Sequence, residues 1–180
     1  GLNNSLVYLG KYQNLHYVAL LLSESQLDSS LEFCNLRTAA KSVTNQLAAI
    51  LNLTVAMASW HEEYIYCCFC GHMTSMTEGG HSRICTNKNC QKQHYPRINP
   101  AVIVLVEKDN RVLLGRKNHW PKERYSTIAG FIEPGECAEQ AVVREVAEET
   151  GIEIISATYF SSQPWPFPGS LMLGYHALAG

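Results

Sequence analysis

The sequence has 180 residues, a formal net charge of −2 and a hydrophobic content of 46%. This length accommodates one ordinary domain or two small ones, and the composition is typical of a globular protein. The charge gives no reason to expect nonspecific binding to nucleic acid, which usually requires a basic field. No apolar stretch approaches the roughly 20 residues of a membrane span, and the first residues lack a secretory signal pattern, so we expect no association with membranes.

Residues 1–66 predict a small α/β domain at the start of the chain. Two apolar runs, 6–9 and 17–22, are separated by a polar turn and predict two strands. Between residues 36 and 64 the apolar residues recur at helical spacing, which predicts one core-facing helix or a pair of helices. We assign no chemistry to this part of the chain.

Residues 67–95 contain two pairs of cysteines, Cys67 and Cys70 as C-x2-C, then Cys85 and Cys90 as C-x4-C. Four thiolates suit a tetrahedral structural zinc site, which leaves no position for a substrate. The cysteine total of seven is odd, so the sequence favours metal-bound thiolates in a reducing compartment over disulfides. Ordinary reduced cysteines are the alternative, because C-x4-C is looser than the commonest spacing. Zinc ribbons also occur in nucleic-acid-binding modules, so this ribbon does not define a function.

The remaining residues, 96–180, predict a larger α/β domain. Its predicted elements are a hairpin over 101–114 that turns at Asp109 and Asn110, a helix over 138–150, and strands near 154–160 and over 171–179. A loop punctuated by glycine and proline joins the hairpin to the helix. Basic residues gather in and before this loop, either as a solvated face or facing phosphate: Lys108, Arg111, Arg116, Lys117, Lys122 and Arg124.

The predicted helix over 138–150 carries a patterned set of acidic residues. At about 100° per residue, Glu145 and Glu149 project from one face, and Glu148 lies beside them. Carboxylates this close repel one another unless divalent cations neutralise them, and hard oxygen ligands select Mg²⁺ or Mn²⁺. Arg144 lies one turn before Glu148 and is expected to hold the array in position, together with Glu136. Cations held in this way favour attack of water on a diphosphate.

This stretch, from Gly130 to Ile152, resembles the Nudix box, G-x5-E-x7-R-E-U-x-E-E-x-G-U with U apolar, at every fixed position. A chance match is expected far less than about once per million registers at ordinary amino-acid frequencies. The alternative is a solvated acidic helix closed by Gly151, a glycine suited to a left-handed C-terminal cap. The resemblance implies an α/β (α+β) class and a Nudix α/β/α sandwich that cleaves a nucleoside diphosphate linked to another group.

A segment rich in proline and aromatic residues, SQPWPFPGSLM, follows at 162–172. Its three prolines are expected to hold a stiff, extended loop, which presents Trp165 and Phe167 as flat surfaces for stacking on a base or nicotinamide ring. A packed loop is the alternative. With the cysteine ribbon before the box, this segment makes the sequence similar to the NADH pyrophosphatase subfamily of Nudix hydrolases. The stretches 78–80, 94–97 and 131–136 are most similar to its eukaryotic, peroxisomal branch.

The subfamily resemblance implies a metal-dependent pyrophosphohydrolase that cleaves NADH or NAD⁺ to nicotinamide mononucleotide and AMP. It also implies removal of NAD caps from RNA, a homodimer, and a peroxisomal or cytoplasmic location. The implied ligands of the catalytic Mg²⁺ or Mn²⁺ are the carbonyl of Ala129 with Glu145 and Glu149, and Glu148 joins them and assists the base step. The implied substrate contacts are Tyr95, Gln163, Pro164, Trp165, Pro166, Phe167, Pro168, Gly169 and Ser170.

The sequence departs from the subfamily near its end. Another metal-binding glutamate of the family lies further beyond the serine of the aromatic-proline motif than this sequence reaches, so we expect a C-terminally incomplete Nudix domain. Either the true protein continues, or this is a truncated form with impaired activity. Two other hypotheses remain open at this point. One is a zinc-ribbon binding module for RNA or protein, in which the Nudix domain only senses ligand, and the other is an enzyme whose main substrate is NAD-capped RNA.

Overall fold

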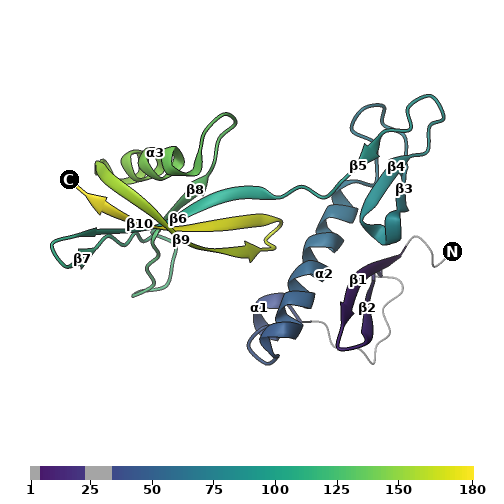
Figure 1. The fold of residues 1–180 in the computed structure, drawn as a ribbon, viewed down its shortest axis with the longest axis horizontal. Coiled ribbons are helices and arrows are strands. Elements are labelled where there is room, and N and C mark those ends of the chain that lie inside the picture. Colours follow the sequence, from purple (N-terminus) through teal and green to yellow (C-terminus); the bar gives the residue numbers. More distant parts are fainter. Residues whose placement is uncertain (1–4, 23–33) are drawn as a thin grey trace. The chain divides into compact units, whose positions relative to one another are not determined.

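The computed structural model describes residues 5–22 and 34–180, which form two compact units (Figure 1). The first unit contains the described residues up to Arg97 together with Pro166–Gly169. The second consists of Ile98–Trp165 and Ser170–Gly180. The predicted division into domains at residues 1–66, 67–95 and 96–180 stays a prediction. None of the helices in the described ranges is long and apolar enough to cross a membrane.

The first unit begins with a β-hairpin that packs against a long helix. Strands β1 (Leu6–Tyr12) and β2 (Leu15–Leu20) pair antiparallel, and both residues of the turn between them have positive φ. The short helix α1 (Leu36–Ala39) and the helix α2 (Asn45–Glu63) follow, each with a side-chain N-cap. Val7 of β1 packs in one buried cluster with Met57 and Trp60 of α2. The predicted strands and the predicted helix pair are therefore both present in this unit.

Next in the first unit is the cysteine-containing segment, a small antiparallel sheet in the order β3-β4-β5. Its elements are β3 (Thr74–Thr77), the 3-10 turn η3 (Glu78–Gly80), β4 (Ser82–Cys85) and β5 (Gln93–His94). A buried polar network joins this sheet to α2. The guanidinium of Arg83 donates to Thr74 Oγ1 at 2.6 Å and to His61 Nδ1 at 2.9 Å, and His61 Nε2–H donates to the carbonyl of Gly80 at 2.8 Å.

The second unit is built around a five-stranded sheet, with four strands in the order β7-β6-β10-β9 and β8 also paired to β6. Only the β6–β10 pair is parallel. One helix, α3 (Ala138–Thr150), packs on the sheet. The strands are β6 (Asn99–Lys108), β7 (Arg111–Val112), β8 (Ile128–Phe131), β9 (Ile154–Trp165) and β10 (Ser170–Ala179).

The core of the second unit lies between β6 and α3. Val102, Val104 and Val106 are buried at alternate positions of β6, as a strand with one covered face requires. Val142 and Val146 of α3 are fully buried against them, one helical turn apart. This packing leaves Glu148 and Glu149 exposed on α3 and keeps Glu145 beside the core, with its side chain 14% exposed.

The structure confirms the mixed α/β class, the helix over 138–150 and the hairpin that turns at Asp109 and Asn110. Two predictions were wrong. The segment predicted as a loop before the helix contains a strand, β8, paired antiparallel with β6. The proline-rich segment is not one extended loop, because Gln163, Pro164 and Trp165 belong to β9 and pair with β10.

Candidate active site

Strand β8 and helix α3 meet at a contact that has no room for a side chain at Gly130 while Glu145 keeps its position. A Cβ atom built on Gly130 would overlap the carboxyl group of Glu145. The backbone of β8 therefore lies directly against this carboxylate. Ala129, whose carbonyl is a predicted metal ligand, is the preceding residue of the same strand. The close approach explains why the first position of the glycine-acidic pattern has no side chain.

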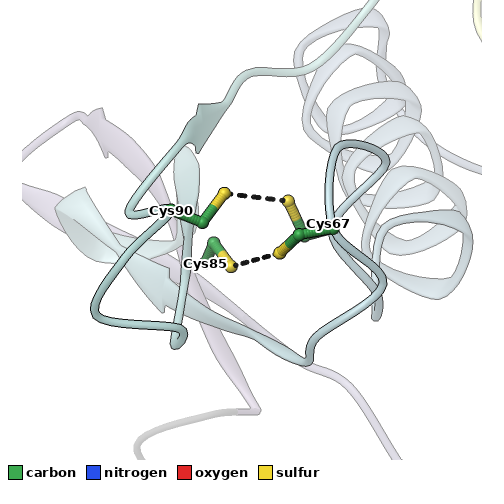
Figure 2. A group of neighbouring side chains, drawn as sticks. Cys67, Cys85 and Cys90 are labelled. Atoms are coloured by element: carbon green, nitrogen blue, oxygen red, sulfur yellow. Dashed lines mark hydrogen bonds between the residues drawn. The ribbon is translucent and has the colours of Figure 1, made fainter.

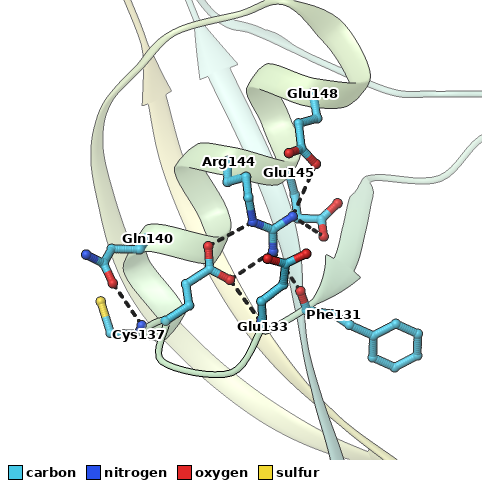
Figure 3. A network of polar contacts seen from close by, with 8 residues as sticks. Phe131, Glu133, Cys137, Gln140, Arg144, Glu145 and Glu148 are labelled. Atoms are coloured by element: carbon cyan, nitrogen blue, oxygen red, sulfur yellow. Dashed lines mark hydrogen bonds and ion pairs between the residues drawn. The ribbon is translucent and has the colours of Figure 1, made fainter.

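Arg144 organises the acidic residues around this contact (Figure 3). Its Nε and Nη2 atoms donate to the two carboxylate oxygens of Glu136 at 2.8 and 2.9 Å, a bidentate pair. Its Nη1 donates to Glu145 Oε1 at 2.9 Å and to Glu148 Oε2 at 3.2 Å. Nη2 also donates to the carbonyl of Phe131 in β8 at 2.9 Å. One guanidinium thus joins the helix, the loop before it and the strand beside it.

The Arg144–Glu136 pair holds its charge over a wide pH range. The guanidinium of Arg144 and the backbone N–H of Glu133 lower the pKa of Glu136 from 4.5 to about 2. The carboxylates of Glu136 and Glu145 in turn raise the pKa of Arg144. The side chains of Glu136 and Arg144 are 14% and 22% exposed, so water screens the pair only in part. The frame that positions Glu145 is therefore fully charged at neutral pH.

The oxygen donors at α3 have the chemistry that a divalent cation prefers, but in this structure they do not converge on one point. Arg144 contacts one oxygen of Glu145 and one of Glu148, so the second oxygen of each carboxylate remains available. Glu149 is exposed on the helix one turn after Glu145. Within the described ranges the four cysteines are the one set of candidate ligands that converges tightly, so the three glutamates lie further apart than a closed metal cage requires. Carboxylate and carbonyl oxygens are the ligands that Mg²⁺ and Mn²⁺ prefer.

The four predicted zinc ligands converge in the first unit (Figure 2). The sulfur atoms of Cys67, Cys70, Cys85 and Cys90 all lie within 4.8 Å of one another. The Cys67–Cys90 and Cys70–Cys85 sulfur distances are 3.8 and 3.4 Å. Tetrahedral ligands at a Zn–S distance of about 2.3 Å stand about 3.8 Å apart, so the cluster has the dimensions of a zinc site.

The thiols of this cluster differ in their environments. A hydrogen bond from the backbone of His72 lowers the pKa of Cys70 to about 6, whereas burial raises the pKa of Cys85 to about 12. Burial without a cation thus opposes the ionisation of Cys85, and a zinc ion would offset this cost because it binds thiolates. Cys68 is exposed beside the cluster and is not one of the four converging thiols.

A pocket of about 410 Å³ opens on the second unit beside β8. Its wall includes Ala129 from β8, Gln163 and Trp165 from the end of β9, and Trp120 and Arg124 from the loop between β7 and β8. Because Ala129 lines the pocket and Gly130 touches Glu145, the pocket and the carboxylate array share one strand. Trp165 is 39% exposed, so its indole is accessible at the surface.

The structure brings together only part of the predicted substrate set. Gln163 and Trp165 line the pocket, and Pro164 lies between them in β9, while Ser170 begins β10. Tyr95, which is 54% exposed, and Pro166–Gly169 belong to the first unit. Trp120 and Tyr125 also line this pocket, although no motif in the sequence marks them. Arg124 is recognisable in the sequence only as one member of the basic run.

Comparisons with known proteins agree with this geometry. The model of the NUDIX domain matches residues 96–177. The chain is 41% identical over 142 residues to the "NAD-capped RNA hydrolase NudC" of Stutzerimonas stutzeri, which covers 79% of this chain and 51% of that protein. It is 39% identical over 155 residues to the human "NAD(P)H pyrophosphatase NUDT13, mitochondrial", which covers 86% of this chain and 43% of that protein.

The fold is also found among solved structures. A NUDIX hydrolase from Nitrosomonas europaea superimposes with a TM-score of 0.53 at 24% identity, over 64% of this chain and 67% of that one. The chain spans between 30% and 51% of the length of curated relatives that it matches. The matched residues contain the whole glycine-acidic pattern, β8 and α3. Residues 96–177 of this chain are therefore a NUDIX domain.

Proposed function

We propose that this chain hydrolyses the diphosphate of NADH or NAD⁺ to nicotinamide mononucleotide and AMP, with Mg²⁺ or Mn²⁺ as cofactor. The observation that carries the proposal is the placement of β8 between two chemically different sites. Gly130 abuts the carboxylate of Glu145 on one side, and Ala129 lines a pocket with an accessible indole ring on the other. A ring in the pocket would bring an attached diphosphate to the carboxylates.

In this proposal the acidic residues of α3 have different roles. Glu145, Glu149 and the carbonyl of Ala129 would hold the cation, which would supply neutralisation of phosphate charge and activation of water. Glu148 joins the ligands and accepts a proton from the attacking water. Arg144 and Glu136 are positioning residues, because their bidentate pair fixes the guanidinium that contacts Glu145 and Glu148.

The substrate contacts are proposed at the hairpin of β9 and β10. Trp165 stacks on a ring of the dinucleotide and Gln163 offers an amide to its polar edge. The remaining proposed contacts are Pro164, Pro166, Phe167, Pro168, Gly169, Ser170 and Tyr95. The names of the relatives favour NAD caps of RNA as a second substrate, since NAD carries the same diphosphate.

The four converging cysteines are proposed to hold a structural zinc ion. Cys67 and Cys85 are buried. The four sulfurs would fill all four tetrahedral positions of the cation, so none remains open for a substrate. The homodimer and the peroxisomal or cytoplasmic location stay predictions from the family resemblance.

Product analysis tests this function. The chain is incubated with NADH, NAD⁺, ADP-ribose and NAD-capped RNA, with Mg²⁺ and Mn²⁺ compared, and the products are separated by chromatography. We expect nicotinamide mononucleotide and AMP from the dinucleotides, and a loss of at least about 100-fold in rate for Glu145→Gln and for Glu149→Gln. Val143→Ala, on an exposed position of the same helix, is the control. Equal rates for the chain and both glutamine variants would refute the proposed site.

A further inference from the structure

The pocket beside β8 contains a cation that the proposed hydrolysis does not use. Of the described residues that line it, Arg124 is the one with a formal charge. The others are apolar, aromatic or neutral polar residues, among them Trp120, Tyr125 and Trp165. A wall of this kind suits a flat ring that carries an anionic group.

The loop that carries Arg124 has a fixed form. Its two ends are joined by paired backbone hydrogen bonds between Gly115 and Ser126, at 2.8 and 2.9 Å. Inside the loop, Arg116 Nη2 donates to the carbonyl of Trp120 at 2.7 Å, and the backbone N–H of Arg124 donates to the carbonyl of Pro121 at 3.2 Å. The loop therefore presents its side chains from a defined backbone.

The guanidinium of Arg124 is positioned by an aromatic ring. Its central carbon lies 5.3 Å from the centre of the Trp120 ring, a cation–π distance. Stacking of this kind leaves the N–H groups at the edge of the guanidinium free to form the bidentate bonds that suit a phosphate. A lysine at this position would keep the charge but would lack the planar fork.

No carboxylate of the described residues forms an ion pair with Arg124. All the ion pairs of the described residues join Arg144 to Glu136, Glu145 or Glu148, so Arg124 takes part in none of them. The loop around it adds three further cations, Arg116, Lys117 and Lys122, against the single acid Glu123, in a chain whose net charge is −2. The local field therefore favours an anion beside the pocket.

The scissile diphosphate does not account for this cation, because its charge is met on the α3 side of β8, where the carboxylates would hold a divalent ion. We propose that Arg124, stacked on Trp120, is a specificity-determining residue that binds a phosphate ester on a ribose of the substrate, outside the scissile diphosphate. This inference rests on the proposed function. The ester would come from the 2′-phosphate of NADPH or from the 3′-phosphodiester that follows the cap of NAD-capped RNA.

Equilibrium binding of three mononucleotide probes tests the role of Arg124 without catalysis. The probes are 5′-AMP, adenosine 2′,5′-bisphosphate and adenosine 3′,5′-bisphosphate, titrated into the chain by calorimetry at constant ionic strength. Because a hydrogen bond to a charged group is worth about a factor of ten or more, at least one bisphosphate is expected to bind about tenfold more tightly than 5′-AMP. A preference for the 2′ or the 3′ isomer identifies the source of the ester.

Three variants separate charge from geometry. Arg124→Gln is expected to reduce the preference to within about twofold while 5′-AMP binds as before, and Arg124→Lys to keep only part of it. Lys122→Gln removes a charge from the same loop outside the pocket and is expected to keep the preference. Equal binding of all three probes, or an equal loss for 5′-AMP and the bisphosphates in Arg124→Gln, would overturn the inference and leave NADH hydrolysis intact. If no probe bound at all, the proposed substrate pocket would fail together with it.

Discussion

Acid is expected to destabilise the first unit through a single buried histidine. His61 lies at the end of α2 with 3% of its surface exposed. Its Nδ1 accepts a hydrogen bond from the guanidinium of Arg83, so a second proton on the ring would face a positive charge. Burial, and then the charge of Arg83, lower the pKa of His61 from 6.5 to about 4. The folded state therefore needs this ring to be neutral.

The size and sign of the effect follow from these two values. Below pH 6.5 the unfolded chain takes up a proton on His61, and the folded chain resists it until the pH approaches about 4. The stabilisation from the neutral ring is thus present above pH 6.5 and is lost as the pH falls toward 4. The difference corresponds to at most about 3 kcal/mol of the free energy of unfolding, which is of the order of 10 °C in the melting temperature of a small unit.

Thermal melting from about pH 8 to about pH 4 measures this loss. His61→Gln keeps an acceptor for Arg83 and a donor for Gly80 but does not titrate. We expect this variant to be less stable than the parent chain at pH 8, with a gap that narrows by about 2–3 kcal/mol at pH 4. His16→Gln, at an exposed position of β2, is the control and should leave the profile unchanged. A gap between parent and His61→Gln that stays constant with pH would refute the reasoning.

Three further predictions concern the sites. Gly130→Ala should displace the Glu145 carboxylate by about 1 Å or more and slow hydrolysis about 100-fold. The control is Gly115→Ala, whose new Cβ would stand 3.6 Å from Ile128 and which should keep the parent rate. Similar rates for both variants would contradict the close contact between Gly130 and Glu145. Metal analysis should find about one zinc per chain, and chelation or Cys70→Ser should lower the melting temperature; unchanged stability would exclude a structural zinc site. Trp165→Ala should weaken the interaction with NADH by about 1–3 kcal/mol, mainly as a higher KM, and leave the hydrolysis of a short diphosphate substrate nearly unchanged. Equal losses on both substrates would show that the indole has a structural role.

The sequence was sufficient for the parts of the structure that depend on local patterns. The spacing of Glu145 and Glu149 and the left-handed Gly151 after Thr150 placed α3 correctly, because helix periodicity and capping are local properties. The four cysteines were likewise visible as two spaced pairs. In both cases the chemistry of a short segment determines its conformation.

The errors arose where conformation depends on distant partners. β8 is four residues long and includes Ala129 and Gly130, so it has no strand pattern of its own and exists through its pairing with β6. Pro164 indicated a loop, yet β9 lies at the edge of the sheet, where a proline does not break a ladder between two neighbours. The pocket at Arg124 was beyond prediction because it forms only when the loop, β8 and β9 meet in space.

The paired hydrogen bonds between Gly115 and Ser126 have a consequence for how this domain changes during evolution or in the laboratory. They close residues 116–125 into one loop module, whose two ends they hold at hydrogen-bonding distance. Insertions, deletions or exchanged sequences inside the module can alter the pocket wall, while β8 keeps its register with β6. Substrate range can therefore diversify by loop grafting in this domain, with the acidic helix inherited unchanged.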